Sequence, residues 1–169
     1  MKKQRPTIPI SEWKLAIHLE ATREIQNQKG MPAYDCNCEW CYTWKHCSRA
    51  VLPEALQEQL TRIGVDLNHP TDLYKFESDE SHSSIRVVYH AVGRIIDGPN
   101  QWKTTEMGKM RIYVTIREKP YLSLAVFPQS QSHEKAPALK NHTAGELICI
   151  DFRLSIPNEI IKGNVPSLA

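Results

Sequence analysis

The strongest constraint on the fold is an alternation of apolar and polar residues near the end of the chain. Every second residue from Ile148 to Ile156 is large and apolar, and smaller or more polar residues stand between them. Successive side chains of a β-strand point to opposite faces of its sheet, so this pattern predicts a strand with one face on a core and one face in water. The predicted buried face consists of Ile148, Ile150, Phe152, Leu154 and Ile156.

Three earlier segments extend this interpretation. Residues 110–117 and 121–127 also alternate, and residues 118–120 between them are few enough for a hairpin. Residues 85–96 are rich in Val, Ile and Tyr and end at the turn signal of residues 97–99. Strands that alternate in this way are typical of an antiparallel sheet with one wet face.

The first part of the chain is less regular. Residues 13–19 alternate and favour a strand, although a helix over residues 11–28 is an alternative, and residues 73–76 suit a short strand. The clearest helix is Pro53–Ile63, with proline in its first turn and Gly64 just past its last. We therefore expect an α+β fold: an antiparallel sheet of four to six strands, this one main helix packed on its apolar face, and a cysteine-rich loop at one edge.

The length and composition indicate one domain. A chain of 169 residues, 41% of them hydrophobic, suits a single core over residues 1–169. Residues 128–145 have no usable periodicity, so we expect a mobile loop there. We also expect loosely ordered tails at 1–10 and 157–169.

The charge of the chain is balanced. Its net charge of +2 comes from 21 basic and 19 acidic residues, which argues against nucleic acid or a membrane surface as the default partner. We see neither a signal sequence nor an apolar run long enough to span a bilayer, and we expect a cytoplasmic protein. That compartment keeps thiols reduced.

Four of the five cysteines lie close together, with the spacing C-x-C-x2-C-x5-C. In a reducing compartment such a cluster favours metal ligands or free thiols over a disulfide or redox pair. Zinc suits thiolates, and a closed four-ligand shell would be structural. Cys36, Cys38, Cys41 and Cys47 are the predicted ligands; His46 or Cys149 are alternatives that would complete the shell.

Two tryptophans accompany this cluster. Trp40 and Trp44 are four residues apart and would lie on one side of a helical turn. They suit a core or a lid over the cysteines, and if exposed they would bind a partner protein, because aromatic residues anchor interfaces.

Evidence for catalysis is weak. A thiol nucleophile needs a base and an orienting group nearby, and His46, His90 and Asp151 are candidates for these roles. Phosphate-binding glycine loops, paired metal-binding histidines and a serine elbow are absent from the sequence. A thiol- or metal-dependent enzyme is therefore the alternative hypothesis.

A second alternative is a single-stranded nucleic-acid binder. The predicted wet face of the sheet offers arginine and tyrosine residues that suit stacking on bases and neutralising phosphates. The balanced net charge disfavours this alternative. These residues are Arg111, Tyr113, Arg117, Tyr121 and Arg153.

Three segments carry a resemblance. They are the Cys36-x-Cys38-x2-Cys41-x2-Trp44 pattern, Leu52-Pro53 leading into Ile63-Gly64-Val65-Asp66, and Tyr89-His90-x-Val92-Gly93-Arg94-Ile95. Over roughly residues 34–155 the chain resembles a group of small uncharacterised bacterial proteins, which implies no activity or cofactor. Cys47 and Cys149 lie outside the shared pattern. In size and style the group resembles immunity-type and accessory proteins of toxin loci, so we expect a non-enzymatic interaction module with an unknown protein partner.

Overall fold

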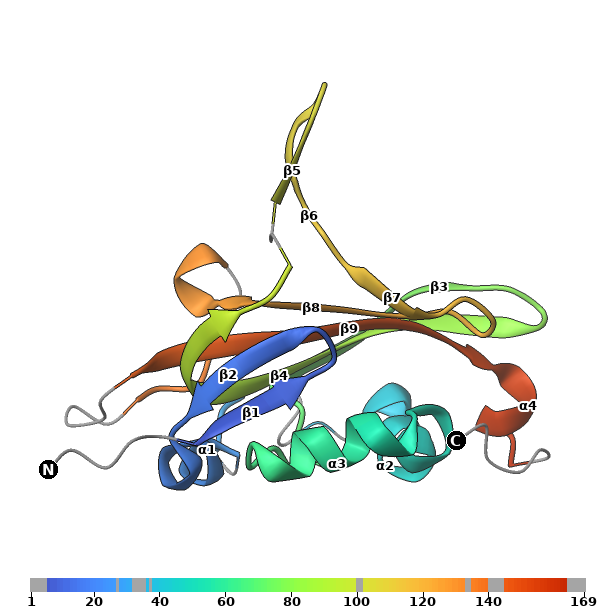
Figure 1. Ribbon diagram of the computed structural model, residues 1–169. Helices are drawn as coiled ribbons and strands as arrows, with labels where there is room; N and C mark the ends of the chain where they lie inside the picture. Colours follow the sequence, from blue (N-terminus) through green and yellow to red (C-terminus); the bar gives the residue numbers. More distant parts are fainter. Residues whose placement is uncertain are drawn as a thin grey trace, which may run out of the picture.

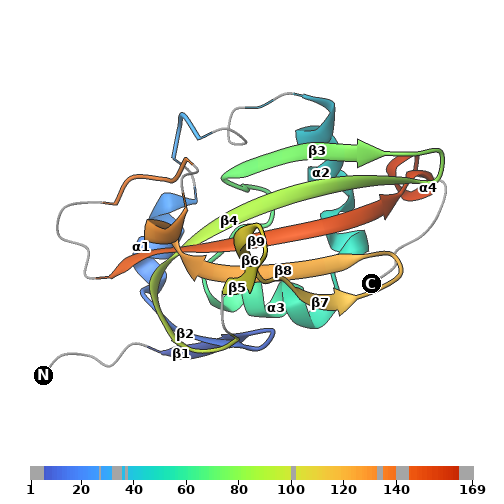
Figure 2. The same ribbon diagram turned by 90° about the horizontal axis from the view of Figure 1, so that it is seen from above.

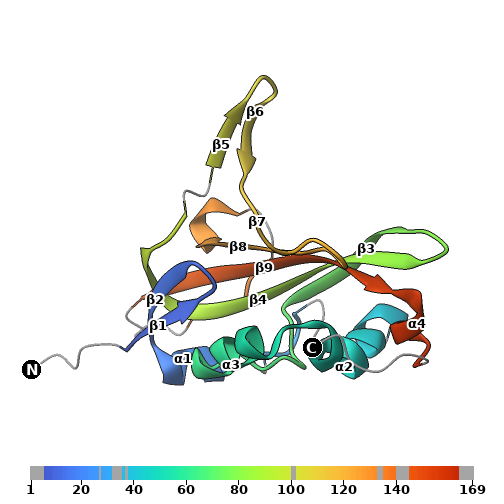
Figure 3. The same cartoon turned by 45° about the vertical axis from the view of Figure 1, so that its right-hand side comes forward.

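A curled antiparallel sheet forms the centre of the molecule, as the computed structural model shows (Figure 1). Helices cover one face of this sheet, and a β-hairpin rises from the other face (Figures 1 and 3). The structure describes residues 6–26, 28–31, 36, 38–99, 102–132, 135–139 and 145–163.

The main sheet has seven strands in the described residues, more than the four to six that we expected. Their order is β1-β2-β4-β9-β8-β7, β3 pairs with β4, and every pairing is antiparallel. Strand β1 was not predicted because Pro6 before it and Pro9 within it suggest a tail, yet an edge strand tolerates proline. The strands are β1 (Thr7–Ile10), β2 (Trp13–Ile17), β3 (Asp72–Ser78), β4 (His82–Asp97), β7 (Val114–Arg117), β8 (Leu122–Pro128) and β9 (Glu146–Pro157).

The helix predicted at Pro53–Ile63 is present as α3 (Glu54–Arg62). It is not the one main helix, because α2 (Glu39–Val51) is longer and also packs on the sheet (Figure 2). The cysteine-rich segment therefore leads into a helix, where a loop was expected. The remaining helices are α1 (Leu19–Ile25), the 3-10 helix η1 (Gln129–Gln131) and α4 (Asn158–Ile161). No helix among the described residues has the length and apolar character needed to cross a membrane.

The core lies between the sheet and helices α2 and α3. The predicted apolar face of β9 is confirmed: all five of its alternating residues are at most 1% exposed. Phe152 in this row packs edge-to-face on Tyr89 of β4, with ring centroids 6.2 Å apart. Trp44 of α2 donates a hydrogen bond from Nε1 to the Tyr89 hydroxyl (2.7 Å), so the helix and the sheet share one buried polar contact.

The opposite face of the sheet is not wet along its centre, contrary to our expectation. Asp151 on that face is fully buried, and its carboxylate accepts hydrogen bonds from Arg86 Nε (3.0 Å) and the Tyr113 hydroxyl (2.8 Å). Phe127 and Cys149 beside it are also buried. A buried carboxylate is tolerable when a cation and hydrogen-bond donors surround it, and alternation alone cannot reveal such a network.

The strand expected over residues 110–117 is broken. Its first part becomes β6 (Gly108–Arg111), which pairs with β5 (Trp102–Thr105) in a separate two-stranded sheet. Its second part, β7, pairs with β8 in the main sheet. Residues 112–113 between them change the direction of the chain, so β5 and β6 project from the sheet as a hairpin (Figure 3). We call this unit the β5–β6 arm.

Parts of the expected tails and loop belong to strands and helices. Strand β1 pairs with β2 inside the first tail, and in the second tail Ile160 of α4 is buried. Within the expected loop at 128–145, η1 forms and Leu139 packs beside α1. The other parts of these predictions fall on residues 1–5, 133–134, 140–144 and 164–169, which lie outside the described residues.

The Arg86–Asp151 pair predicts a strong effect on stability. Replacing Asp151 by alanine should lower the free energy of unfolding by about 3–5 kcal/mol, because the Arg86 guanidinium then stays buried without its anion. Arg153→Ala, on the same face but exposed, should change it by less than about 0.5 kcal/mol. Urea denaturation of both variants measures this difference, and similar values for the two would contradict the assignment of the pair.

Candidate metal centre

The cysteine cluster lies at the beginning of α2. Cys38 is the N-cap residue of this helix, and its Sγ accepts a hydrogen bond from the Cys41 backbone N–H (3.4 Å). Cys36 precedes the helix, and its Sγ accepts from the Cys38 N–H (3.4 Å). Unsatisfied N–H groups and the helix dipole at such a terminus favour negative charge, so the local backbone suits thiolates.

Three thiols converge there. The Sγ atoms of Cys36, Cys38 and Cys41 all lie within 4.8 Å of one another. Tetrahedral zinc with Zn–S bonds of about 2.3 Å places its sulfur ligands about 3.8 Å apart, so a small adjustment would let all three bind one ion. Cys38 is exposed, Cys36 is half-buried and Cys41 is buried, which leaves the cluster open on one side.

Cys47, the fourth predicted ligand, does not join this group. Six residues along an α-helix correspond to a rise of about 9 Å and a rotation of about 120° away from Cys41. The Cys47 side chain is buried in the main core, and burial raises the pKa of its thiol to about 11. The structure therefore brings together three of the four predicted ligands, and all five cysteines are free thiols.

The thiols of Cys38 and Cys41 differ in acidity. The Cys36 thiol and the Cys41 N–H hydrogen-bond to Cys38 and lower the pKa of its thiol to about 7. Burial and its two thiol neighbours raise the pKa of Cys41 well above the ordinary value. Cys38 is thus a thiolate at neutral pH in a large share of molecules, which is the form that binds a metal.

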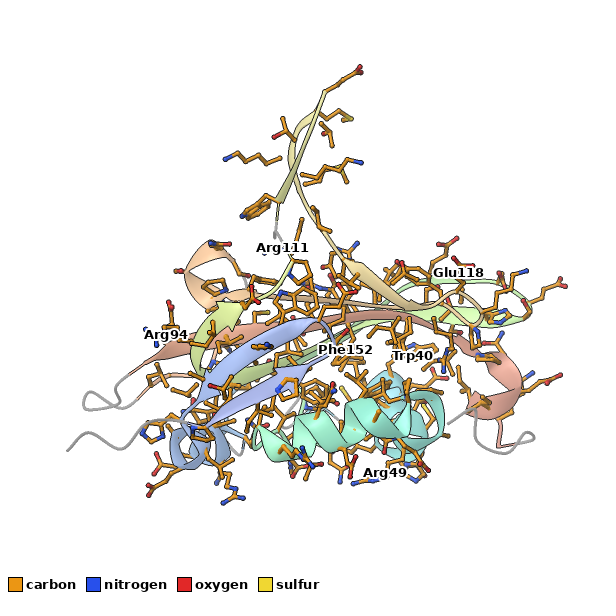
Figure 4. All side chains as sticks on the ribbon, in the orientation of Figure 1. Trp40, Arg49, Arg94, Arg111, Glu118 and Phe152 are labelled. Atoms are coloured by element: carbon orange, nitrogen blue, oxygen red, sulfur yellow. The ribbon has the colours of Figure 1, made fainter. Side chains whose placement is uncertain are left out.

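The two tryptophans have different environments. Trp44 is 0% exposed, so of the roles that we considered it has that of a core residue and not that of a partner contact. Trp40 is half-buried, and the Lys75 ammonium of β3 lies 5.6 Å from the centroid of its ring (Figure 4 labels Trp40). Tyr42, which we had not predicted as a surface residue, is 63% exposed and packs on the His46 ring with centroids 4.1 Å apart. The helical period that buries Cys41 and Trp44 could have indicated this exposed position.

The proposed catalytic candidates occupy separate networks. His46 is exposed and its Nδ1 contacts the Tyr42 carbonyl oxygen at 3.1 Å, whereas Asp151 is paired with Arg86. His90 contacts the Thr71 hydroxyl and the Gln129 side chain, each at 2.6 Å. Strand register places His90 opposite Cys149, but both are 1% exposed, so this pair offers a substrate no access.

The low pKa of Cys38 predicts its reactivity in metal-free protein. The rate of alkylation at Cys38 should rise with pH to a plateau with a midpoint of about 7, because the thiolate is the nucleophile. Cys47 should stay unmodified in the same range, since its pKa is about 11. Mass spectrometry of iodoacetamide-treated protein measures both rates; a Cys38 midpoint near 9, the ordinary value, would contradict the geometry.

Comparisons with protein-family models, with curated proteins and with solved structures return no match for this chain.

Proposed function

We propose that this chain is a non-enzymatic protein-interaction module whose contact surface is stabilised by one zinc ion. The observation that carries the proposal is the convergence of three thiols at the beginning of α2. Thiolate sulfur is a soft ligand, which suits zinc among the common divalent metals. Five free cysteines suit a reducing compartment such as the cytoplasm.

Zinc at this place would have a structural role. Cys36, Cys38 and Cys41 would hold it, which would tie the chain before α2 to the first turn of the helix. The side-chain acceptors at this terminus are the weakly accepting sulfur atoms of Cys36 and Cys38, so a metal would add to the local stability. Water or a further ligand would complete the tetrahedral shell.

The surface beside the cluster supports an interaction with a protein. Tyr42 and the half-buried Trp40 project from the first turns of α2, and Phe76 of β3 is 53% exposed. Helix α2 contacts β3, and among the described residues β3 pairs with β4 alone. Exposed aromatic residues anchor interfaces, and an edge strand offers free backbone groups to a partner. An immunity-type or accessory role would use such a surface.

One observation favours the alternative of a metal-dependent enzyme. Three thiols converge among the described residues, so a tetrahedral zinc ion held by them would keep its fourth coordination position open. Catalytic zinc sites keep one position open in the same way. Two of the described histidines weigh against this alternative, since His46 and His90 lie in other networks. Turnover that requires both the metal and Cys38 would favour the enzyme over the interaction module.

Zinc binding is testable by elemental analysis. Protein purified without added metal should contain about one equivalent of zinc, and a chelator should lower its melting temperature, because metal binding is coupled to folding. Cys38→Ser and Cys41→Ser should lose the zinc. The matched control Cys47→Ala removes another thiol of α2 and should keep it. Metal-free protein with an unchanged melting temperature would rule out the site.

The interaction surface is testable by affinity purification from the native cell. The intact chain should recover one dominant protein partner, and Tyr42→Ala should reduce recovery at least tenfold, as expected for an aromatic anchor. Tyr121→Ala, which removes another exposed tyrosine that lies just before β8 and outside α2 and β3, is the matched control and should recover the partner normally. Equal recovery by both variants would exclude this surface.

A further inference from the structure

The sheet face opposite α2 and α3 carries a series of arginine–aromatic contacts. Arg153 lies over the Tyr113 ring at 4.4 Å from its centroid, and Arg86 lies over Tyr74 at 5.6 Å. Arg111, labelled in Figure 4, lies between two rings at the base of the β5–β6 arm. Its guanidinium carbon is 3.3 Å from the centroid of Phe127 and 4.4 Å from that of Trp102.

Two of these arginines keep uncompensated charge. Arg86 is neutralised by Asp151, but neither Arg111 nor Arg153 forms an ion pair with a carboxylate in the described part of the chain. Arg111 Nη2 donates to the Gln131 carbonyl oxygen (2.8 Å), whereas its Nη1 is buried and has no hydrogen-bond partner among the described residues. A buried donor without an acceptor is costly, so this position favours an anion.

The β5–β6 arm adds positive charge above the same face. Figure 2 shows the arm end-on over β8 and β9. Lys103 and Lys109 are exposed on its two strands, and Glu106 at its tip is its one acidic residue. The arm and the central part of this face together hold five basic residues against three acidic ones, whereas α2 and α3 hold three of each. The basic residues are Arg86, Lys103, Lys109, Arg111 and Arg153, and the acidic ones are Asp72, Glu106 and Asp151.

The balanced net charge of the chain therefore hides an uneven distribution. Its acidic side chains gather in part at the far end of the sheet, where Glu77, Asp79 and Glu118 line a cavity of about 660 Å³. Figure 4 shows Glu118 there, away from Arg111. These carboxylates disfavour an anionic ligand at that end of the sheet, compared with the arm and the adjacent face.

We propose that the β5–β6 arm and the adjacent sheet face bind single-stranded nucleic acid. Lys103, Lys109, Arg111 and Arg153 would contact phosphates, and this interaction is separate from the protein surface proposed at α2. Bases would stack on Trp102 and on the exposed guanidinium plane of Arg153, which the Tyr113 ring already holds in place. Charge alone would suit any polyanion, but these ordered planar groups favour a ligand that stacks.

The direct experiment is fluorescence anisotropy with labelled 15-nucleotide single strands of RNA and of DNA. Binding should weaken as salt rises, since phosphate contacts release counterions. The double variant Lys103→Glu/Lys109→Glu should weaken binding at least tenfold, and Arg153→Ala should weaken it severalfold. Because these side chains are exposed, the variants should melt like the parent protein. A difference between RNA and DNA would show whether the 2′-hydroxyl is recognised.

Matched controls separate this surface from the rest of the molecule. Arg49→Glu and Arg62→Glu place the same charge change on α2 and α3, where Arg49 lies on the far side of the molecule (Figure 4), and should leave binding unchanged. Cys38→Ser should also keep it, so loss of zinc and loss of this surface are distinguishable. The proposal is overturned if neither strand binds, if the controls weaken binding equally, or if polyglutamate competes as well as unlabelled oligonucleotide.

Discussion

The position of the candidate metal centre depends on one buried hydrogen-bond chain. Trp44 Nε1 donates to the Tyr89 hydroxyl, which in turn donates to the Leu67 carbonyl oxygen at 2.7 Å. Trp44 and Tyr89 are both 0% exposed, so water cannot replace either bond and their loss would leave buried polar groups unsatisfied. These two hydrogen bonds join α2 to strand β4 and to the segment before β3. Because α2 is fixed at Trp44, about one and a half turns after its first residue, its N-terminus presents Cys38 and Cys41 in a defined place beside β3.

The two faces of the sheet therefore carry different kinds of side chains. On the helix side an apolar core around Phe152 holds α2, whose beginning brings together the thiols that we propose as zinc ligands. On the opposite side the buried Arg86–Asp151 pair anchors Tyr113, and Tyr113 lies where the chain turns from the β5–β6 arm into β7. Desolvation raises the pKa of Tyr113 far above its ordinary value, so it remains a neutral donor to Asp151. Each proposed binding surface rests on its own side of the same sheet.

Sequence analysis predicted those features that depend on local periodicity. The apolar row of β9 and helix α3 were predictable because burial of every second residue, or of one helical face, produces a periodic pattern of apolar residues in the sequence. It failed where a contact between distant residues decides the outcome. Asp151 appeared solvent-exposed until Arg86, 65 residues earlier, was placed beside it. Cys47 appeared to be a ligand by spacing, yet the helix that begins at Glu39 turns its side chain into the core. For Trp44 the spacing left a core position and an exposed partner contact both open, and its hydrogen bond to the distant Tyr89 places it in the core.

The most direct measurement of the central claim is zinc K-edge X-ray absorption on the purified protein. The account predicts a first shell of three sulfur atoms at about 2.3 Å and one lighter ligand, because three thiols converge and Cys47 is held in the core. Cys47→Ala should give the same spectrum. A shell without sulfur would contradict the proposed centre, and a four-sulfur shell that loses one sulfur in Cys47→Ala would contradict the position of Cys47.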